Sequence, residues 1–239
     1  MIRYLSPMNE RLHLPCRALL FDLDGTLVDN MMVHHRAWQR KLAELGLDYT
    51  LERVKAEIHG VNLEILARLF GERFTEEERR QIAWDKEAAY RDIFAADFAA
   101  NVVPGAVEFI RQASATGIPM AVGTAGPQEN AEFVVENLGV GELMGHVVHS
   151  GMVSRGKPDP EVFRQGADAL GVDLADCLIF EDSVTGAAAA RNAGCPVVVL
   201  TTTHQPPEFS HLPVADFRPD FRGLRVVTTP EGFAVTDGN

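Results

Sequence analysis

Two aspartates, Asp22 and Asp24, stand one residue apart where a short apolar run, residues 18–21, leads into a turn at Gly25. An apolar run of this length is typical of a buried parallel strand, and ligands bind an open α/β sheet at the carboxyl ends of its strands. Because side chains alternate along a strand, both carboxylates face the same side, where burial is costly unless a cation or a reaction uses them. The spacing therefore predicts a metal site with a nucleophile and a proton carrier. Taken alone, the same residues also fit an ordinary Asp-Gly turn, with Asp22 as a helix cap.

Two further polar clusters stand shortly before expected helices. Thr124 stands in the segment Gly-Thr-Ala-Gly, residues 123–126, directly before an expected helix. Its hydroxyl and the neighbouring backbone N–H groups could cradle an anion, although a helix cap would use the same residue type. Lys157 precedes a proline-bounded turn, residues 158–160, where its charge could balance carboxylates and a phosphoryl group. A solvated surface lysine is the alternative.

Glu181 and Asp182 form another cluster, which closes the expected strand 177–180 and adds carboxylates to the same sheet edge. Crowded carboxylates without a cation raise one another's pKa and cost stability. A donor set of oxygens alone, few of them from the protein, suits Mg²⁺ with its retained waters. The sequence therefore predicts Mg²⁺ as the cofactor, with helix capping by Asp182 as the alternative.

The elements that must position these residues fall into two groups. From about Asn30 to Ala100 the apolar pattern is helical, with helices expected at 31–45, 62–70 and 75–98. From Pro104 onward, strands alternate with helices, which is typical of a parallel, doubly wound sheet. The expected helices there are 105–116, 127–138, 160–170 and 183–192, and the expected strands are 118–123, 177–180, 196–200 and 214–217.

The order of these groups predicts an α/β fold with an insertion. One strand precedes the helical block and the other strands follow it. We therefore expect residues 1–30 and 101–239 to form the sheet domain. Residues 31–100 are expected to form a small α-helical cap, inserted after the first strand, over the carboxyl edge of the sheet. The tail from Thr228 onward is expected to be irregular.

The overall composition excludes several function classes. Of the 239 residues, 46% are hydrophobic and 23% are charged, a composition that allows a buried core. The net charge of −12 predicts that the protein binds nucleic acids poorly. Three scattered cysteines without a CxxC pair predict reduced, buried thiols. Residues 1–15 lack the apolar core of a signal peptide, and no segment is apolar enough to span a bilayer. We therefore expect a cytoplasmic protein, monomeric by default, with no nucleic-acid or membrane partner.

Four segments follow one another along the chain: FDLDGT at 21–26, the strand that ends at Thr124, GKPDP at 156–160 and FEDS at 180–183. This ordered set resembles the motifs of the haloacid dehalogenase superfamily of phosphotransferases, and the resemblance extends over residues 18–224. It implies a Rossmann-like core in which Asp22 is a nucleophile that forms an aspartyl-phosphate and Asp24 is the general acid and base. Family dehalogenases lack this second acid, so phosphoryl transfer is favoured over carbon–halogen chemistry.

The same resemblance implies roles for the remaining motif residues. The metal ligands that it implies are Asp22, Asp24 through its backbone carbonyl, and Asp182, with Glu181 in support. The residues that it implies for phosphoryl and substrate binding are Thr124 and Lys157, together with Thr26, Ala125 and Gly126. Lys157 would also hold Asp22.

The insertion point and the helical content resemble the cap of the beta-phosphoglucomutase-like branch, and residues 29–38 resemble the mutase segment. His34 and Trp38 fall where mutases place a histidine and a tryptophan that face the sugar site. Since they are four residues apart, they share one helix face. Core packing under the cap is an equal alternative for Trp38.

Two cap positions separate a hydrolase from a mutase. Mutases have a lysine where His59 stands and an arginine, which grips a second phosphate, where Leu63 stands. Leu63 cannot hold that phosphate and His59 carries little charge at neutral pH, so the departure favours a hydrolase. His59 and Asn62 are expected to bind sugar hydroxyls, with a surface position beside a turn as the alternative for His59.

These observations predict a Mg²⁺-dependent phosphohydrolase that acts on a small phosphorylated metabolite, a sugar phosphate, through an aspartyl-phosphate. A beta-phosphoglucomutase and an inorganic pyrophosphatase are alternatives on the same scaffold. A different class of alternative is a binding or regulatory module that keeps the fold without catalysis. The presence of Asp22, Asp24, Lys157 and Asp182 together argues against such a module.

Overall fold

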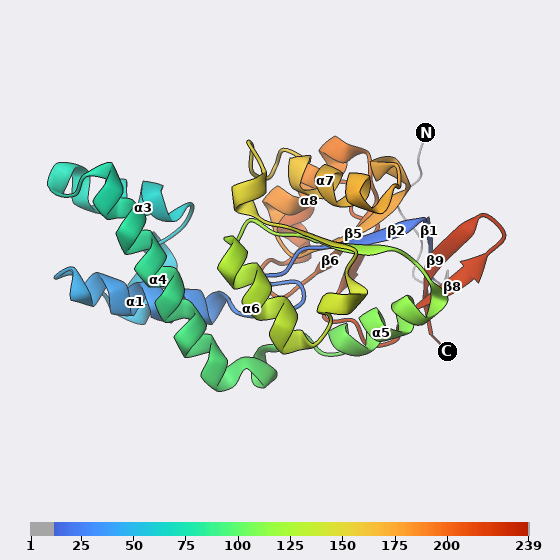
Figure 1. Ribbon diagram of the computed structural model, residues 1–239, viewed down its shortest axis with the longest axis horizontal. Coiled ribbons are helices and arrows are strands. Elements are labelled where there is room, and N and C mark those ends of the chain that lie inside the picture. The colour runs from blue at the N-terminus through green and yellow to red at the C-terminus, as the bar shows by residue number, and fades with distance from the viewer. Residues whose placement is uncertain (1–11, 239) are drawn as a thin grey trace. The chain divides into compact units, whose positions relative to one another are not determined.

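The computed structural model describes residues 12–238 and separates the chain into two compact units (Figure 1). One, the sheet unit, comprises the chain up to Asp29 and from Val102 onward, and the other, the helical unit, is Asn30–Asn101. The expectation about a signal peptide falls mainly on residues 1–11, which lie outside the described residues. No helix within residues 12–238 is both long and apolar enough to cross a membrane.

The sheet unit is built on six parallel strands in the order β4-β3-β2-β5-β6-β7. The strands are β2 (Ala18–Phe21), β3 (Met120–Gly123), β4 (His146–Val148), β5 (Cys177–Glu181), β6 (Val197–Leu200) and β7 (Asp216–Arg218). Every residue of β2, β3, β5 and β6 is buried, as expected for parallel strands that are covered on both faces. The predicted doubly wound α/β fold is therefore confirmed. Strand β4 was not predicted, because it has only three residues and begins with a half-buried histidine.

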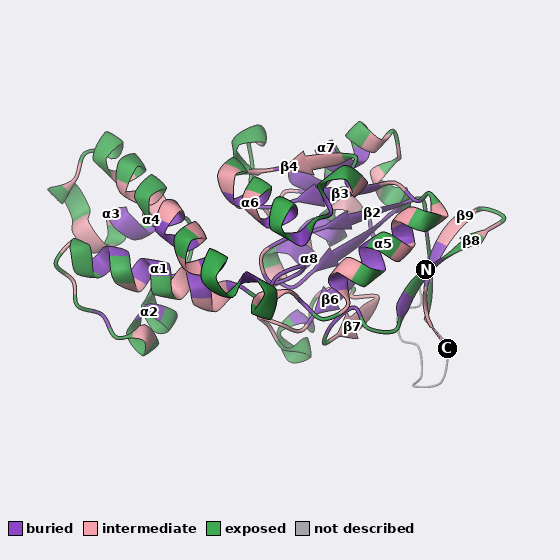
Figure 2. Cartoon of the chain, turned by 60° about the horizontal axis from the view of Figure 1, so that its bottom comes forward, coloured by how far each residue is buried: buried purple, intermediate pink, exposed green. Residues whose placement is uncertain are grey.

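Helices cover both faces of this sheet (Figure 1). They are α5 (Ala106–Thr116), α6 (Gln128–Leu138), α7 (Glu161–Leu170) and α8 (Val184–Ala193). Small and apolar side chains of α7 and α8, such as Phe163, Ala167 and Ala187, share one core cluster with Leu20 of β2 and Ala121 of β3. Figure 2 shows that the buried residues follow the strands, while the outer sides of the helices are exposed.

An aromatic cluster fills the opposite face of the sheet. Phe21 stacks on Phe180 with ring centroids 5.1 Å apart, and Phe221 lies 5.2 Å from Phe180 and 5.5 Å from Phe109 of α5. Phe21 ends β2 and Phe180 is the penultimate residue of β5. The cluster therefore anchors the two strand ends that carry the acidic residues.

The strand order creates a switch point beside β2. The chain runs from β2 outward through β3 and β4, returns to β5 on the other side of β2, and continues to β6 and β7. The segments that follow β2 and β5 thus lead to opposite halves of the sheet. In open α/β sheets, ligands bind at the carboxyl ends of strands at such a point. Asp22 and Asp182 directly follow these two strands.

A second sheet corrects the expectation for the C-terminal tail. Strands β1 (His13–Cys16), β9 (Gly232–Asp237) and β8 (Leu224–Thr229) form an antiparallel sheet in that spatial order. The tail from Thr228 onward is therefore regular, and the prediction was wrong. Its Val and Thr residues favour strands, and a Pro-Glu-Gly turn joins them into a hairpin.

The outer edge of β8 is closed by a side chain of α5. The N–H of Val226 donates to Gln112 Oε1 at 2.8 Å, and Gln112 Nε2 donates to the Val226 carbonyl at 2.9 Å. One amide side chain thus replaces the backbone partner that a further strand would supply.

The helical unit contains α1 (Met31–Glu44), α2 (Leu51–Glu57), α3 (Asn62–Phe70) and α4 (Glu76–Asp97). Its core gathers apolar side chains from α1, α3 and the segment around α2: Trp38, Leu42, Tyr49, Val54, Ile58, Ile65 and Leu66. The predicted capping box begins α4, since Thr75 accepts the N–H of Glu78 and Glu78 accepts the N–H of Thr75. Helix α2 was not predicted as a separate element.

We expect Phe221→Ala to lower the free energy of unfolding by about 3–5 kcal/mol, because removal of a buried ring leaves a cavity among three other rings. Urea denaturation measures this change. Val227→Ala, at an exposed position of β8, is the control and should change the value by about 0.5 kcal/mol or less. A similar small change for both variants would contradict the role of the aromatic cluster.

Candidate functional site

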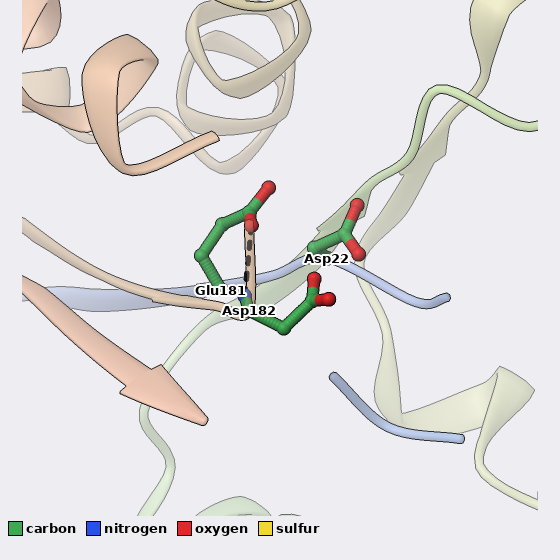
Figure 3. A group of neighbouring side chains, drawn as sticks. All are labelled: Asp22, Glu181 and Asp182. Carbon is green, nitrogen blue, oxygen red and sulfur yellow. Dashed lines mark hydrogen bonds between the residues drawn. The ribbon is translucent and has the colours of Figure 1, made fainter. Parts of the chain in front are cut away.

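Three carboxylates meet where β2 and β5 end (Figure 3). Asp22, Glu181 and Asp182 each offer an oxygen, these oxygens lie within 4.8 Å of one another, and all three residues are buried. The N–H of Asp22 donates to the Phe180 carbonyl at 3.0 Å, so Asp22 continues the hydrogen-bonded ladder next to β5. Neighbouring parallel strands thus bring together acids that lie far apart in the sequence.

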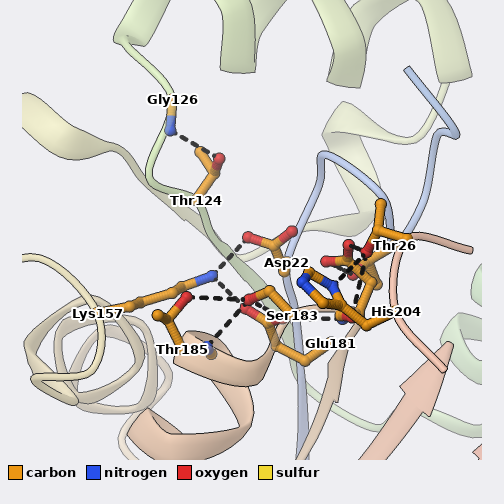
Figure 4. Close-up of polar contacts among 12 residues, drawn as sticks. Asp22, Thr26, Thr124, Gly126, Lys157, Glu181, Ser183, Thr185 and His204 are labelled. Atoms are coloured by element: carbon orange, nitrogen blue, oxygen red, sulfur yellow. Dashed lines mark hydrogen bonds and ion pairs between the residues drawn. The ribbon is translucent and has the colours of Figure 1, made fainter. Parts of the chain in front are cut away.

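Lys157 reaches this cluster from the loop before α7 (Figure 4). Its Nζ donates to Asp22 Oδ1 at 2.5 Å and to Glu181 Oε1 at 2.7 Å, and its side chain is 7% exposed. Nζ also lies 4.7 Å from the ring centroid of Phe163 in α7. Burial alone would lower the pKa of Lys157, but the two carboxylates outweigh it and raise that pKa, so the lysine stays charged.

Burial dominates the ionisation of the two aspartates. It raises the pKa of Asp22 to about 7, against the opposing charge of Lys157 and with the support of Glu181 and Asp24. The pKa of Asp182 is raised well above its ordinary value by burial and then by the charges of Glu181 and Asp22. Both aspartates therefore accept a proton readily when no cation is present.

Glu181 differs from the two aspartates because each of its oxygens accepts close hydrogen bonds from the protein, at 2.7–2.9 Å. Oε1 accepts from Lys157, and Oε2 accepts from the N–H of Asp182, the N–H of Ser183 and Ser183 Oγ at 2.8–2.9 Å. Burial would raise the pKa of Glu181, but Lys157 and Ser183 hold it below its ordinary value. A Cβ on Gly186 would lie 1.7 Å from Oε1, so α8 approaches this carboxylate more closely than any side chain allows. Glu181 thus holds Lys157 and the start of α8.

The donor chemistry of this cluster fits a divalent cation. Within residues 12–238, Asp182 forms no ion pair, and the single charge of Lys157 is shared between Asp22 and Glu181. In their ionised forms the buried carboxylates of Asp22 and Asp182 therefore carry more negative charge than the protein balances, and they offer oxygen atoms alone. Such a donor set suits Mg²⁺, which binds through one or two carboxylates and keeps several waters.

The turn after β2 contains Asp24, the second aspartate of the segment FDLDGT. The N–H of Gly25 donates to the Val28 carbonyl at 2.7 Å, and Gly25 has a φ of +88°, which favours glycine. A Cβ on Gly126 would lie 3.4 Å from Asp24 Oδ2, so the Asp24 carboxylate borders the loop after β3. Thr26 is fully buried and donates to Asp182 Oδ1 at 3.4 Å. Its hydroxyl therefore contacts an acid of the cluster.

The loop after β3 contains the residues of the predicted anion cradle. Thr124 is buried, and its Oγ1 accepts the N–H of Gly126 at 3.0 Å. Ala125 between them is exposed. The Gly126 carbonyl accepts the N–H of Ser150 at 2.9 Å, which ties this loop to the segment after β4.

In the helical unit, two of the expected substrate residues join one polar network. The His34 ring stacks on Tyr90 with centroids 4.0 Å apart, and Lys86 Nζ lies 2.9 Å from His34 Nδ1. Lys86 Nζ also donates to Glu87 Oε1 at 2.9 Å, and that oxygen accepts from Asn62 Nδ2 at 2.6 Å. The buried pair Lys86 and Glu87 was missed from the sequence. Its signal is that Lys86 lies in the apolar stripe of α4, four residues before Tyr90.

The other two expected residues of this unit lie differently. Trp38 is 4% exposed and belongs to the apolar core, with Lys86 Nζ 5.6 Å from its ring centroid. His59 is exposed, and its Nε2 lies 2.9 Å from the Ala56 carbonyl one turn earlier. The environments of Trp38 and His59 therefore match the alternatives of core packing and of a surface turn.

One loop of the sheet unit was missed altogether. Thr202, Thr203 and His204 follow β6 at the same edge of the sheet and make hydrogen bonds to Gly25 and Asp182. Figure 4 labels His204 of this loop. The only signal of the three residues in the sequence is their position directly after an apolar strand, because threonine runs are common in surface loops.

Comparison with known proteins shows which family and which proteins the chain is similar to. A family model described as haloacid dehalogenase-like hydrolase matches residues 16–194. Validoxylamine A 7'-phosphate phosphatase of Streptomyces hygroscopicus subsp. limoneus is 34% identical over 191 residues, which cover 79% of this chain and 87% of the relative. Hexitol phosphatase A of Escherichia coli K12 is 30% identical over 199 residues, 82% of this chain and 88% of the relative.

Solved structures share the fold. Beta-phosphoglucomutase from Clostridium difficile aligns with a TM-score of 0.67 and 26% identity over 77% of this chain and 84% of that chain. The resemblance predicted from the four motifs is thereby confirmed at the level of the family and of its fold.

The metal-free protein should become more stable as the pH falls from about 8 to about 6. Asp22 has a folded pKa of about 7, above its ordinary 3.8, so the folded state takes up this proton first. The resulting stability is fully present below the unfolded pKa, is lost as the pH rises through about 7, and amounts to about 1 kcal/mol over this range. Urea denaturation in EDTA measures it. Asp22→Asn should reduce this pH dependence, to which the raised pKa of Asp182 also contributes, and an unchanged slope in that variant would contradict the assignment.

Proposed function

Because the chain belongs to the haloacid dehalogenase-like hydrolases, we propose that it is a Mg²⁺-dependent phosphatase that hydrolyses a small sugar phosphate through an aspartyl-phosphate. The observation that carries this proposal is the buried ion pair of Lys157 with Asp22 and Glu181, next to an Asp182 that has no ion pair among the described residues. The names of the two relatives given above, validoxylamine A 7'-phosphate phosphatase and hexitol phosphatase A, agree with it in reaction type.

Asp22 is the nucleophile in this proposal. Lys157 holds its Oδ1 at 2.5 Å and favours the ionised carboxylate against the effect of burial, so the other oxygen can attack phosphorus. The phosphorus–oxygen ester bond then breaks, and the leaving alkoxide takes a proton from Asp24. In the second step Asp24 accepts a proton from water, which attacks the aspartyl-phosphate and releases inorganic phosphate. Asp22 and Asp24 return to their starting states.

The remaining residues position the metal ion and the phosphoryl group and balance their charge. Asp22 and Asp182, with the backbone carbonyl of Asp24, would hold Mg²⁺, which offsets charge on the phosphoryl oxygens when bound. Thr124 and the N–H groups of Ala125 and Gly126 bind the phosphoryl group. Glu181 acts on Lys157 and is not a direct metal ligand in this proposal, because both of its oxygens already accept protein hydrogen bonds.

A hydrolase is favoured over a mutase by the helical unit. Leu63 stands on α3 where the beta-phosphoglucomutase-like pattern has an arginine, and an aliphatic side chain cannot retain a second phosphate between two half-reactions. Inorganic pyrophosphate and beta-glucose 1-phosphate belong in the substrate panel because they test the two alternative activities directly. A bisphosphorylated sugar that accumulates during turnover would favour the mutase.

We expect Asp22→Asn to abolish phosphate release, with a loss of at least about a thousandfold, because the nucleophile is removed while the shape is kept. The measurement is a phosphate-release assay over sugar phosphates, nucleotides and pyrophosphate, with Mg²⁺ and with EDTA. Asp168→Asn, at an exposed position of α7, is the control and should retain wild-type rates. Turnover by Asp22→Asn at the wild-type rate, or full activity in EDTA, would rule out this mechanism.

The proposal also assigns recognition of the sugar to the helical unit, through the network of His34, Asn62, Lys86 and Glu87. Asn62→Ala should raise KM for the sugar phosphate by about tenfold, the cost of one or two hydrogen bonds, and leave p-nitrophenyl phosphate turnover unchanged. Gln81→Ala, whose side chain pairs with Asp85 on the exposed side of α4, is the control. Equal losses on both substrates would count against recognition by this network.

A further inference from the structure

Three consecutive side chains of the loop after β6, the last of them His204 (Figure 4), contact the acid cluster and the turn beside it. Thr202 Oγ1 donates to the Gly25 carbonyl, and Thr203 Oγ1 donates to Asp182 Oδ2. His204 Nδ1 lies 3.2 Å from the Asp182 carbonyl and 3.0 Å from Thr203 Oγ1. This loop therefore contacts both segments that carry acids, the turn after β2 and the residue after β5.

The protons in this group can be assigned from its acceptors. The Asp182 carbonyl has no proton, so His204 Nδ1 must carry one to make a favourable contact with it. Thr203 has a single hydroxyl proton, and the Asp182 carboxylate in its ionised form, the form that binds a metal ion, can only accept. The hydroxyl of Thr203 therefore donates to Oδ2, and His204 donates toward Thr203 Oγ1 and the Asp182 carbonyl. The loop offers protons to Asp182 and accepts none from it.

Asp182 depends on these hydroxyls more than its neighbours do. Asp22 and Glu181 are held by the charge of Lys157, whereas the side-chain donors to Asp182 within the described residues are Thr203 at Oδ2 and Thr26, at 3.4 Å, at Oδ1. The bond from Thr26 is long and therefore weak. Oδ2 is also packed against the turn after β2, since a Cβ on Gly25 would lie 2.1 Å from it.

We propose that Thr203 is a positioning residue for the metal site. Its hydroxyl donates a hydrogen bond to Oδ2 and thereby holds the carboxylate of Asp182 against Gly25. Oδ1 is then the oxygen that is available to bind Mg²⁺. Partners of this kind orient metal-ligating carboxylates, and their removal costs metal affinity without removing a ligand. Thr202 assists by holding the Gly25 carbonyl, which keeps the turn beside Asp182. The assignment rests on the Mg²⁺ site of the proposed function.

The test compares Thr203→Val, which keeps the shape and removes the hydroxyl, with Thr203→Ser, which keeps the hydroxyl. Thr201→Val is the matched control, because Thr201 stands next to the same loop and its Oγ1, among the described residues, makes only a long bond of 3.4 Å to the carbonyl of Arg218 in β7. Isothermal titration of the full chain with Mg²⁺, without substrate, measures the dissociation constant. Urea denaturation of the same samples checks that each variant is folded.

Thr203→Val should weaken Mg²⁺ binding by about tenfold or more, whereas Thr203→Ser and Thr201→Val should stay within about twofold of the wild type. Thr203→Ala replaces the valine variant if valine prevents folding. Phosphate release should fall more at limiting than at saturating Mg²⁺, which a purely structural role would not produce. Unchanged Mg²⁺ affinity in Thr203→Val, beside clear binding by the wild type, would overturn this assignment alone. Absence of Mg²⁺ binding by the wild type would overturn the metal site of the proposed function as well.

Discussion

A lysine buried between two carboxylates is the interaction on which the acid cluster depends. Burial raises the pKa of Asp22 and would raise that of Glu181, and Lys157 opposes both effects from distances of 2.5 and 2.7 Å. One positive charge thus serves two acids, and the third acid, Asp182, is left to hydroxyl donors. The unbalanced charge lies next to the nucleophile, where a divalent cation gains most from it.

The backbone approaches the acid cluster closely on two sides, and this holds the carboxylates in place. A Cβ would lie 2.1 Å from the Asp182 carboxylate at Gly25 and 1.7 Å from the Glu181 carboxylate at Gly186. These glycines let the turn after β2 and the first turn of α8 press directly on the acids. Beneath them the stacked rings of Phe21 and Phe180 hold the two strand ends in register.

The sequence was most informative where acidic or basic residues stand in recognisable motifs near the ends of strands. Asp22, Lys157 and Asp182 could be located because they belong to a set of motifs in a fixed order along the chain, although each residue alone also fits a turn, a surface lysine or a helix cap. Thr203 and Lys86 could not be located in this way. A threonine after a strand and a lysine on a helix usually face water, and only the packed structure shows that both lie against other polar groups. The tail was misjudged because its alternation becomes meaningful only with β1 as a third strand.

The pairing of Gln112 with Val226 has a consequence for how copies of this protein behave at high concentration. A bare outer strand invites another chain to add to the sheet, which leads to association and fibre-like growth. Here the middle of β8 already has both of its outward-facing backbone groups satisfied by an amide from α5. An incoming strand would have to break these two bonds before it could form its own. The single neutral side chain of Gln112 thus opposes the addition of another strand to this edge of the antiparallel sheet.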